Sequence, residues 1–416
     1  MNARNVGAIA VSASLVLVAM ACSNGSVTEE GGAPDAGSST PIPAEAGGPS
    51  AEPPDASDAS RDADAAERVC TDEGWCHTVV PDAQTLRSVW SDGQGSAWAV
   101  TEQGNILRWD GTAWVQSHAA GVPLYAVWGS SPTDLWAGGG APTTGDQASP
   151  GTLLHGTGPS PSTIAWEAVA APAAVRSIWG TSATDVWAIA SVPERFRTDD
   201  PSFVLHYSGP AGAGDAGSEW KVDPVSNEFP SYFQKAWGTS KDDIWVTGRV
   251  AGDFDSVQGR LYHRRPDGEG GFVWRIDQPT PLNDWTPIPA VLDGISVSPS
   301  MVFLIQLSSY SGDLLYHKGI SNDDGATFTW TERPTSETGF TYNAVSTIWG
   351  SSPDDVWLAG SLGRLRHWDG AKWRAAEVSL DGLPVQKAIH AIWGSGPDDV
   401  WAVGQDVALH KGAPGK

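Results

Sequence analysis

Residues 348–360 read Ile-Trp-Gly-Ser-Ser-Pro-Asp-Asp-Val-Trp-Leu-Ala-Gly, and this stretch decides the fold because copies of it recur along the chain. In every close copy two tryptophans stand eight residues apart. The six pairs are Trp90 and Trp98, Trp128 and Trp136, Trp179 and Trp187, Trp237 and Trp245, Trp349 and Trp357, and Trp393 and Trp401. A repeat with constant internal spacing is typical of a protein built from equivalent structural units.

A seventh, degenerate copy fills the one large gap in the series. Ile295 to Phe303 keeps the eight-residue spacing but has neither tryptophan. Without this copy, 112 residues would separate Trp237 from Trp349; with it, successive copies begin 38 to 58 residues apart. That period is typical of propeller blades and differs from that of helical or leucine-rich repeats.

Each copy predicts four strands, A to D. Strand A ends in Trp-Gly, Ser-Ser-Pro-Asp-Asp supplies turn residues, strand B is of the Asp-Val-Trp type, and strand C resembles 363–368. Strand D carries one more tryptophan in six of the units: Trp114, Trp166, Trp220, Trp274, Trp330 and Trp373.

The last unit stops after strand C, at Leu409-His410-Lys411, whereas residues 74–79 have the D pattern with no A to C strands before them. We therefore predict an all-β, seven-bladed propeller over residues 69–416, with four-stranded antiparallel blades and the N-terminal strand completing the last blade. Such closure removes exposed sheet edges.

The 22 tryptophans have two possible roles. They could fill the wedge between neighbouring blades, each burying on the order of 200 Å², or they could form an exposed carbohydrate platform. Recurrence at the same strand positions favours packing.

The first 22 residues predict a lipoprotein signal peptide. Arg4 precedes an apolar run, Val6 to Ala21, that ends at Cys22 after small residues. The run resembles the lipobox of bacterial lipoproteins, which implies cleavage and lipidation at Cys22. Ala19 stands where leucine is commoner, and an ordinary cleaved signal is the alternative.

Residues 23–68 consist largely of Ala, Gly, Pro, Ser and Asp, with ten acidic and two basic residues. We expect a disordered, extended linker. The formal net charge of the chain is −24, which argues against nucleic acid as a partner. Cys70 and Cys76 predict a disulfide in an exported protein, with two unpaired thiols as the alternative.

Residues 321–328 read Ser-Asn-Asp-Asp-Gly-Ala-Thr-Phe and match the Asp-box pattern at Ser321, Asp323, Gly325, Thr327 and Phe328. The chain thus resembles the neuraminidase-type repeat propellers, in which this motif is a structural hairpin between the third and fourth strands. Residues 69–416 also look like the Trp-Gly-Ser-Ser-Pro-Asp-Asp-Val-Trp repeat proteins exported by myxobacteria.

Sialidase chemistry would need an arginine triad, a Tyr–Glu nucleophile pair and an Asp acid/base. We cannot assemble this set from the sequence, and fold alone does not supply function. We predict no catalytic residues, no metal and no cofactor. The paired carboxylates Asp242-Asp243, Asp354-Asp355 and Asp398-Asp399 are interpreted as solvated turn residues. The strand C histidines recur once per blade, which favours a structural or surface role: His155, His206, His263, His317, His367 and His410.

Irregular segments are the best candidates for recognition. In this topology the B–C and D–A connections share one face. The long ones are 139–151, 191–202, 249–259 and 277–290. The candidate binding face comprises Arg195, Arg197, Arg249, Asp253, Phe254 and Trp285. The alternative is that these segments are tolerated insertions.

The sequence therefore predicts a non-catalytic, monomeric binding or scaffold propeller, lipid-anchored at the bacterial cell envelope, which recognises protein or glycan. The alternatives are a sialidase-like glycan hydrolase and an envelope assembly factor. Carboxylates and arginines that converge in a central pocket would favour the hydrolase, and a channel lined by small apolar residues would favour the scaffold.

Overall fold

The computed structural model describes residues 70–81, 83–141, 149–192, 202–210, 220–251, 257–279, 290–307, 314–340, 344–380 and 383–412. The chain divides into two compact units, Met1–Arg61 and Asp62–Lys416, and every described residue belongs to the second. The described residues contain no helix with the length and hydrophobicity needed to cross a membrane.

Seven four-stranded antiparallel sheets form the described part of the chain, and we number them as blades in chain order. Blade 1 is β2 (Leu86–Ser91), β3 (Ala97–Thr101), β4 (Asn105–Trp109) and β5 (Trp114–Ala119). Blade 2 is β6 (Leu124–Ser131), β7 (Asp134–Gly140), β8 (Gly151–Thr157) and β9 (Ala165–Ala171). Blade 3 is β10 (Val175–Ser182), β11 (Asp185–Ser191), β12 (Ser202–Tyr207) and β13 (Trp220–Val222).

The remaining blades repeat the pattern. Blade 4 is β14 (Tyr232–Ser240), β15 (Asp243–Ala251), β16 (Val257–Pro266) and β17 (Phe272–Ile276). Blade 5 is β18 (Ala290–Ser298), β19 (Met301–Leu307), β20 (Leu314–Ile320) and β21 (Thr329–Pro334). Blade 6 is β22 (Val345–Ser352), β23 (Asp355–Gly360), β24 (Leu365–Trp368) and β25 (Trp373–Ala375). Blade 7 is β28 (Ile389–Gly396), β29 (Asp399–Gly404), β30 (Val407–Gly412) and β1 (Trp75–His77).

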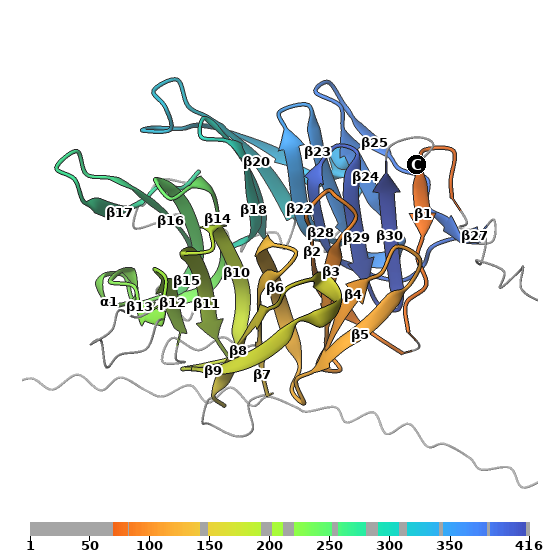
Figure 1. Ribbon diagram of the computed structural model, residues 1–416. Coiled ribbons are helices and arrows are strands. Elements are labelled where there is room, and N and C mark those ends of the chain that lie inside the picture. The colour runs from red at the N-terminus through yellow and green to blue at the C-terminus, as the bar shows by residue number, and fades with distance from the viewer. Residues whose placement is uncertain are drawn as a thin grey trace, which may run out of the picture. The chain divides into compact units, whose positions relative to one another are not determined.

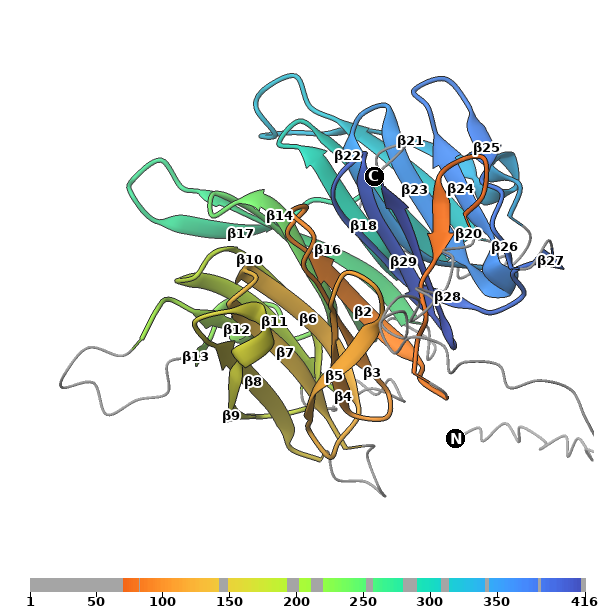
Figure 2. The ribbon, with the colours of Figure 1, turned by 45° about the vertical axis from the view of Figure 1, so that its right-hand side comes forward.

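The seven blades close into a ring. Their first strands contact one another in the order β2, β6, β10, β14, β18, β22, β28 and back to β2. In Figure 2, the sheets of blades 1 and 2 stand beside each other. The predicted seven-bladed β-propeller is therefore confirmed, including the degenerate fifth unit, which is a complete four-stranded blade.

The predicted sharing of the last blade between the two ends of the chain is also confirmed. Trp75, Cys76 and His77 of β1 pair antiparallel with Lys411, His410 and Leu409 of β30, and Figure 1 shows the two strands side by side. The Trp75 side chain is fully buried. The ring is therefore closed by strand pairing, which leaves blade 7 without an unpaired outer edge on β30.

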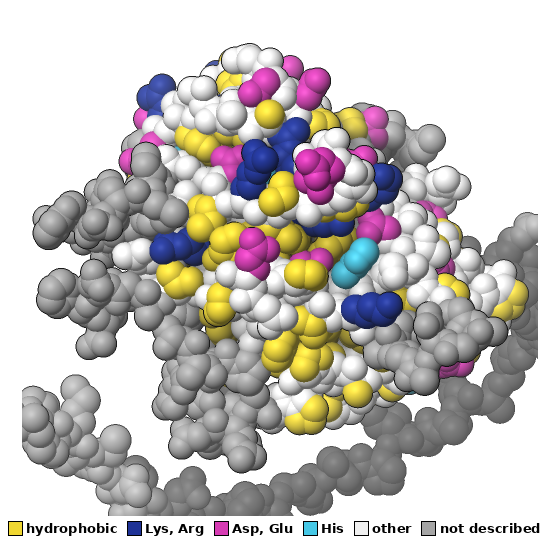
Figure 3. Space-filling view, turned by 90° about the vertical axis from the view of Figure 1, so that its left-hand side faces the viewer, with side chains coloured by type: hydrophobic (Ala, Val, Ile, Leu, Met, Phe, Trp, Pro, Cys, Tyr) yellow, Lys and Arg dark blue, Asp and Glu magenta, His cyan; other side chains and the backbone are white. Residues whose placement is uncertain are grey.

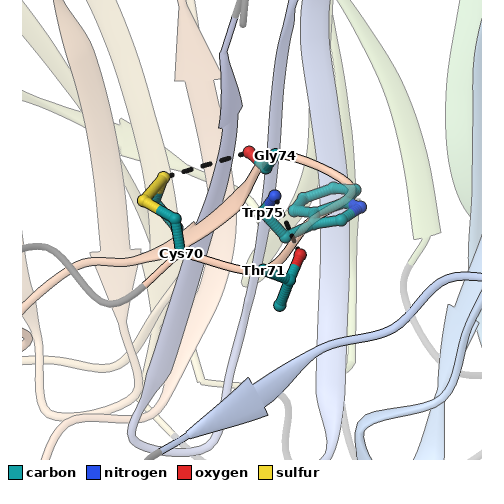
Figure 4. Close-up of a disulfide and its surroundings, with 5 residues drawn as sticks. Cys70, Thr71, Gly74 and Trp75 are labelled. Atoms are coloured by element: carbon teal, nitrogen blue, oxygen red, sulfur yellow. Dashed lines mark hydrogen bonds between the residues drawn. A yellow bond between two sulfur atoms is a disulfide. The ribbon is translucent and has the colours of Figure 1, made fainter. Parts of the chain in front are cut away.

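A disulfide joins the residues on either side of the turn that leads into β1. The Sγ atoms of Cys70 and Cys76 are 2.07 Å apart, and the Trp75 amide donates a hydrogen bond to Thr71 Oγ1 at 3.3 Å (Figure 4). A cross-link across a short loop lowers the entropy of the unfolded segment. It therefore favours the turn conformation that delivers Trp75 into the core.

Some connections differ from the sequence prediction. In the segment 249–259, residues 249–251 and 257–259 are strand, because β15 and β16 continue pairing as far as Ala251 and Val257. A short helix, α1 (Val225–Glu228), and a two-stranded hairpin, β26 (Ser379–Leu380) with β27 (Leu383–Pro384), lie in D–A connections and were not predicted. Short 3₁₀ turns occur at η1 (Pro161–Thr163), η3 (Thr335–Thr338) and η4 (Ser361–Gly363).

Aromatic contacts hold neighbouring blades together. The strand B tryptophan of one blade meets the strand D tryptophan of the next, with ring centroids 5.0–6.4 Å apart and nearly perpendicular planes. At the junction of blades 5 and 6, where strand B carries Phe303, the contact is Tyr316 with Trp373. The other six contacts are Trp98–Trp166, Trp136–Trp220, Trp187–Trp274, Trp245–Trp330, Trp357–Trp75 and Trp401–Trp114.

The strand B tryptophans are at most 3% exposed, so the packing interpretation is confirmed and these rings offer no platform to a sugar. The Trp-Gly pair of strand A has a related explanation. A Cβ on Gly180 would lie 2.9 Å from the Trp128 ring of the preceding blade, and one on Gly238 would lie 2.8 Å from Trp179. Glycine is therefore required so that the preceding tryptophan can pack against the backbone.

Replacing Trp75 with alanine should lower the free energy of unfolding by about 3–5 kcal/mol, the usual cost of a large cavity in a packed core. Val79, a nearby side chain that is 63% exposed, provides the control. Val79→Ala should change stability by less than about 0.5 kcal/mol. Urea unfolding of the two variants measures the difference, and equal stabilities would contradict closure through β1.

Candidate binding site in the central channel

Every first strand carries a β-bulge at the same place. The pairing register between strands A and B shifts by one residue, for example between Leu86 and Ser88 and between Val175 and Ser177. The same shift occurs in all seven blades. A bulge leaves one residue unpaired and redirects its side chain.

The seven bulge residues line a single cavity of about 900 Å³ at the centre of the ring. The preceding residue is buried in every blade, whereas the bulge residue keeps some solvent exposure. In blade order the bulge residues are Arg87, Tyr125, Arg176, Gln234, Leu292, Ser346 and His390. They lie near the start of strand A, at the mouth where the B–C and D–A connections meet.

These positions vary, whereas their surroundings repeat. The bulge residue always stands three positions before the first tryptophan or its equivalent Ile295, yet the seven side chains are of six different types. A position that served only packing in equivalent blades would be filled by similar side chains, as the strand B tryptophans are. We call the seven bulge residues the bulge ring. They are the part of the repeat whose side chain changes from blade to blade.

The channel is charged. Its lining includes four cationic side chains, Arg87, Arg176, Lys235 and Arg249, and two acidic ones, Glu102 and Asp293. Arg87 Nη2 forms an ion pair with Glu102 Oε1. Burial lowers the pKa of nearby His390, and Arg87 lowers it further while Glu102 opposes the shift. The lining carries an excess of positive charge in a chain whose net charge is −24.

Asp293 is a structural carboxylate. Its Oδ2 accepts a hydrogen bond from the Ile348 amide of blade 6 at 3.1 Å, and its Oδ1 pairs with Lys235 Nζ of blade 4. Ser88 and Ser177 occupy the equivalent position in blades 1 and 3, and each accepts a hydrogen bond from the next blade's backbone. In blades 1, 3 and 5 the side chain after the bulge thus ties the blade to the next one.

Arg176 and Arg249 face the same part of the mouth. Arg176 lies over the Tyr125 ring, 5.4 Å from its centroid. Arg249 Nε donates a hydrogen bond to Gln234 Oε1 at 2.8 Å. Burial lowers the pKa of Arg249, Tyr232 opposes the shift, and the positive charge of Arg176 lowers it further. The two guanidinium groups are therefore close enough to repel each other.

Of the candidate binding residues, the structure describes only Arg249. It lies in β15 at the channel mouth, in a strand and not in the predicted loop. Arg195, Arg197, Asp253, Phe254 and Trp285 lie outside the described residues, as does Cys22. The bulge residues were missed, although their constant distance from the tryptophan and their varying identity are visible in the sequence.

The interpretation of the paired carboxylates as solvated is wrong for the second member of each pair. Asp243, Asp355 and Asp399 are largely buried, and each accepts hydrogen bonds from the strand B tryptophan Nε1 and a strand C histidine Nε2. In blade 3, Asp185 makes the same hydrogen bonds with Trp187 and His206, and in blade 2 Asp134 bonds to His155. We call an aspartate with these partners the Asp–His–Trp unit. The histidine also stacks on the tryptophan, with centroids 3.7–4.2 Å apart. The five Asp–His pairs are Asp134–His155, Asp185–His206, Asp243–His263, Asp355–His367 and Asp399–His410.

His317 is not equivalent to the other strand C histidines, as the sequence alignment had assumed. The residue opposite Phe303 is Lys318, and His317 pairs with Leu304. Lys318 Nζ lies 5.6 Å from the Phe303 centroid, in the place of the stacked imidazole. Burial lowers the pKa of His317 to about 4. Blade 5 has Met301 where five of the other blades have the aspartate (blade 1 has Ser96), so a histidine at the stacking position would have no carboxylate partner.

The Asp-box segment links β20 to β21, the third and fourth strands of blade 5. Asp323 accepts hydrogen bonds from the Thr327 amide and hydroxyl at 2.9 and 2.7 Å, and the Ser321 hydroxyl accepts one from the Gly325 amide. Hydrogen bonds from Ser321 and Thr327 lower the pKa of Asp323 to about 2. Phe328 packs edge-on against Trp245 of blade 4. All these contacts join residues of the propeller to one another, so the segment has a structural role.

Within the described ranges, no group of three His, Cys, Asp or Glu side chains could hold a metal ion. On the face drawn in Figure 3, lysine and arginine side chains lie beside acidic ones, with hydrophobic side chains between them. The charge on that face is thus mixed, in contrast to the predominantly cationic channel lining.

Comparisons with known proteins find the fold but no family. No family model matches the sequence, and no curated protein matches it. Among solved structures, YCF48 bound to D1 peptide is 14% identical, with a TM-score of 0.52 over 83% of this chain and 99% of that one. YCF48 from Cyanidioschyzon merolae is 14% identical (TM-score 0.53, 82% and 99%), and U3-55K is 9% identical (0.54, 83% and 100%). At these identities the similarity concerns the fold alone.

Asp399→Asn should reveal what the Asp–His–Trp unit contributes to stability. Burial alone raises the pKa of Asp399, but hydrogen bonds from His410, Ser91 and Ser395 outweigh it and bring the pKa to about 2. Because this value lies below the ordinary 3.8, the stabilisation is complete above about pH 4 and is lost as the pH falls towards 2. The difference between the ordinary pKa of 3.8 and a pKa of about 2 corresponds to about 2 kcal/mol.

Urea unfolding at pH 7 should therefore show Asp399→Asn less stable by about 2 kcal/mol, with the gap closing between pH 4 and 2. The exposed neighbour Asp398 is the control, and Asp398→Asn should have little effect. A gap that stays constant with pH would contradict the role of the charged carboxylate.

Proposed function

We propose that this protein is a non-catalytic binding propeller that holds a segment of a protein partner in the mouth of its central channel. The observation that supports this proposal is the bulge ring: seven equivalent backbone positions present side chains of six different types to one cavity. Rigid scaffolds with variable lining residues are the usual basis of recognition. YCF48, a propeller of similar fold, has been solved with a D1 peptide bound.

The sialidase-like hydrolase is the alternative that needs the closest comparison, because the channel does gather three arginines and two carboxylates. From the sequence we expected that carboxylates and arginines converging in a central pocket would favour a hydrolase, and this lining has both. Both carboxylates, however, have cationic partners: Glu102 pairs with Arg87 and Asp293 with Lys235. Asp293 also holds the blade 6 backbone. A glycosidase needs one carboxyl group to act as a general acid and a nucleophile beside it, so these partners support binding over hydrolysis.

We propose further that the propeller is tethered to the bacterial cell envelope. Residues 1–22 would be removed or lipidated at Cys22 as a lipoprotein signal, residues 23–68 would act as an extended acidic linker, and residues 69–416 would be the propeller. The Cys70–Cys76 disulfide supports an oxidising compartment. The Asp-box segment and the tryptophan repeat support kinship with exported propellers of the neuraminidase type and of the myxobacterial repeat type. Recognition of a glycan and a role in envelope assembly remain alternatives to the protein partner.

Affinity capture from solubilised envelopes of the source bacterium tests the binding role. The wild-type chain is compared with a variant carrying Tyr125→Ala, Gln234→Ala and His390→Ala, three bulge residues spread around the ring. We expect a defined partner that is retained by the wild type and reduced at least fivefold by the variant. Outer-surface changes at Thr331 and Lys372, both exposed, should leave capture unchanged. Equal capture by the bulge variant would place the binding surface elsewhere.

Cys22→Ser tests the anchor. A lipoprotein should incorporate an alkyne-tagged fatty acid and sediment with membranes, whereas the serine variant should incorporate none and shift to the soluble fraction. Cys70→Ser, which alters a different cysteine of the same chain, should keep the label. Labelling that survives Cys22→Ser would contradict lipidation at this residue.

A further inference from the structure

We infer that a second pocket, between blades 4 and 5, binds a tetrahedral dianion such as phosphate or sulfate through Arg265 and Arg275. This inference goes beyond the proposed function, because no residue lines both this pocket and the central channel. The pocket has a volume of about 260 Å³, and we call it the inter-blade pocket. Blade 4 contributes residues of β16 and β17, and blade 5 contributes Thr327 and Phe328 of the Asp-box segment.

Strand pairing places the polar side chains of blade 4 on one side of the β16–β17 hairpin. His263 lies directly opposite Arg275, and Arg265 follows His263 by two residues, so all three side chains share that side. The side faces blade 5, because the Phe328 ring centroid is 6.1 Å from that of His263, and Arg265 Nη2 donates a hydrogen bond to the Asp324 carbonyl at 2.9 Å. The two arginines are diagonal neighbours, whose Cα atoms are typically about 7–8 Å apart. Both can therefore contact one bound group.

The positive charge of the two guanidinium groups is not neutralised. In the part of the chain that the structure describes, neither Arg265 nor Arg275 forms an ion pair. Asp277 also lines the pocket, but its Oδ2 faces His263 Nδ1, 3.4 Å away. Arg265 Nη1 is buried without a hydrogen-bond partner among the described residues. A buried cationic donor is unfavourable until an acceptor reaches it, and a bound oxyanion supplies that acceptor.

Blade 4 differs from the other blades at the position of Arg265. This position comes two residues after the strand C residue that pairs with the strand B tryptophan or phenylalanine. Packing of the blades does not require an arginine there, because the other six blades hold no cation at it. Arg265 is therefore available for binding. The residues of the other blades are Asp110, Thr157, Ser208, Ile320, Asp369 and Gly412.

The chemistry of the pocket suits a tetrahedral dianion. A planar guanidinium donates two parallel hydrogen bonds to an oxyanion, and two such groups match a double negative charge. The volume is below the about 300–1,000 Å³ of pockets for drug-sized ligands, so the pocket takes a single anionic group. Phe328 and Ile276 are partly buried and form apolar walls, which strengthen the attraction by lowering the local dielectric constant.

Isothermal titration calorimetry of the purified full-length protein in non-ionic detergent tests the inference. The probes are sodium phosphate, sodium sulfate and sodium acetate, at neutral pH and low salt. The wild type is compared with Arg265→Gln plus Arg275→Gln, with Arg275→Gln alone, and with a charge-matched control, Arg333→Gln plus Arg374→Gln. The control arginines are exposed on the outer strands β21 and β25. Arg275 is itself exposed, so its single substitution should preserve the fold, and circular dichroism checks every variant.

We expect the wild type to bind phosphate or sulfate saturably and at least tenfold more tightly than acetate. The double variant should lose at least tenfold in affinity, Arg275→Gln at least threefold, and the control less than twofold. Tighter binding of phosphate identifies a phosphoryl ligand and tighter binding of sulfate a sulfate ester, and either result supports the inference.

The inference is overturned if neither dianion binds saturably, if acetate binds as tightly, or if the double variant binds both dianions as well as the wild type does. Each of these results leaves the proposed function standing, because partner capture tests the central channel separately.

Discussion

The contact between the strand B tryptophan of one blade and the strand D tryptophan of the next is the interaction on which the rest of the structure depends. It occurs at six of the seven blade junctions, and Tyr316 with Trp373 replaces it at the seventh. Perpendicular indole pairs of this kind contribute about 0.5–1.5 kcal/mol each beyond their buried area. Because the ring is closed, each blade depends on two such junctions. Trp75 therefore matters as much as any tryptophan within the repeat, although it comes from the far end of the chain.

The same packing leaves one place per blade open to variation. Strand A is fixed by its buried residue before the bulge and by the tryptophan after it, which packs on the glycine of the next blade. Between them the bulge turns one side chain towards the channel. The fold and the proposed recognition thus depend on different positions of one repeat, so the lining can change without disturbing the junctions. The three aspartates thought to be solvated belong to the fold, because His, Trp and Ser or Thr side chains surround them.

Most of the fold was predictable because the tryptophans stand at constant spacing, and the count of strand D tryptophans pointed to Trp75 as the missing member. The channel site was not predicted. A bulge is a property of strand pairing, and nothing in Leu86-Arg87-Ser88 or its equivalents marks the middle residue as unpaired. His317 was misassigned for a related reason, since sequence similarity aligned it with the other histidines while pairing with β19 put Lys318 at that position. The three buried aspartates were missed because their histidine partners lie on strand C, 11 to 20 residues away.

We propose that the bulge ring serves binding and contributes little to stability. Urea unfolding of a variant in which all seven bulge residues are alanine tests it most directly, with Trp245→Ala as the reference for a lost junction. We expect the seven-alanine variant to unfold within about 2 kcal/mol of the wild type, because partly exposed side chains contribute little to stability, while Trp245→Ala should lose about 3–5 kcal/mol. A seven-alanine variant that is as unstable as Trp245→Ala, or that fails to fold, would contradict it.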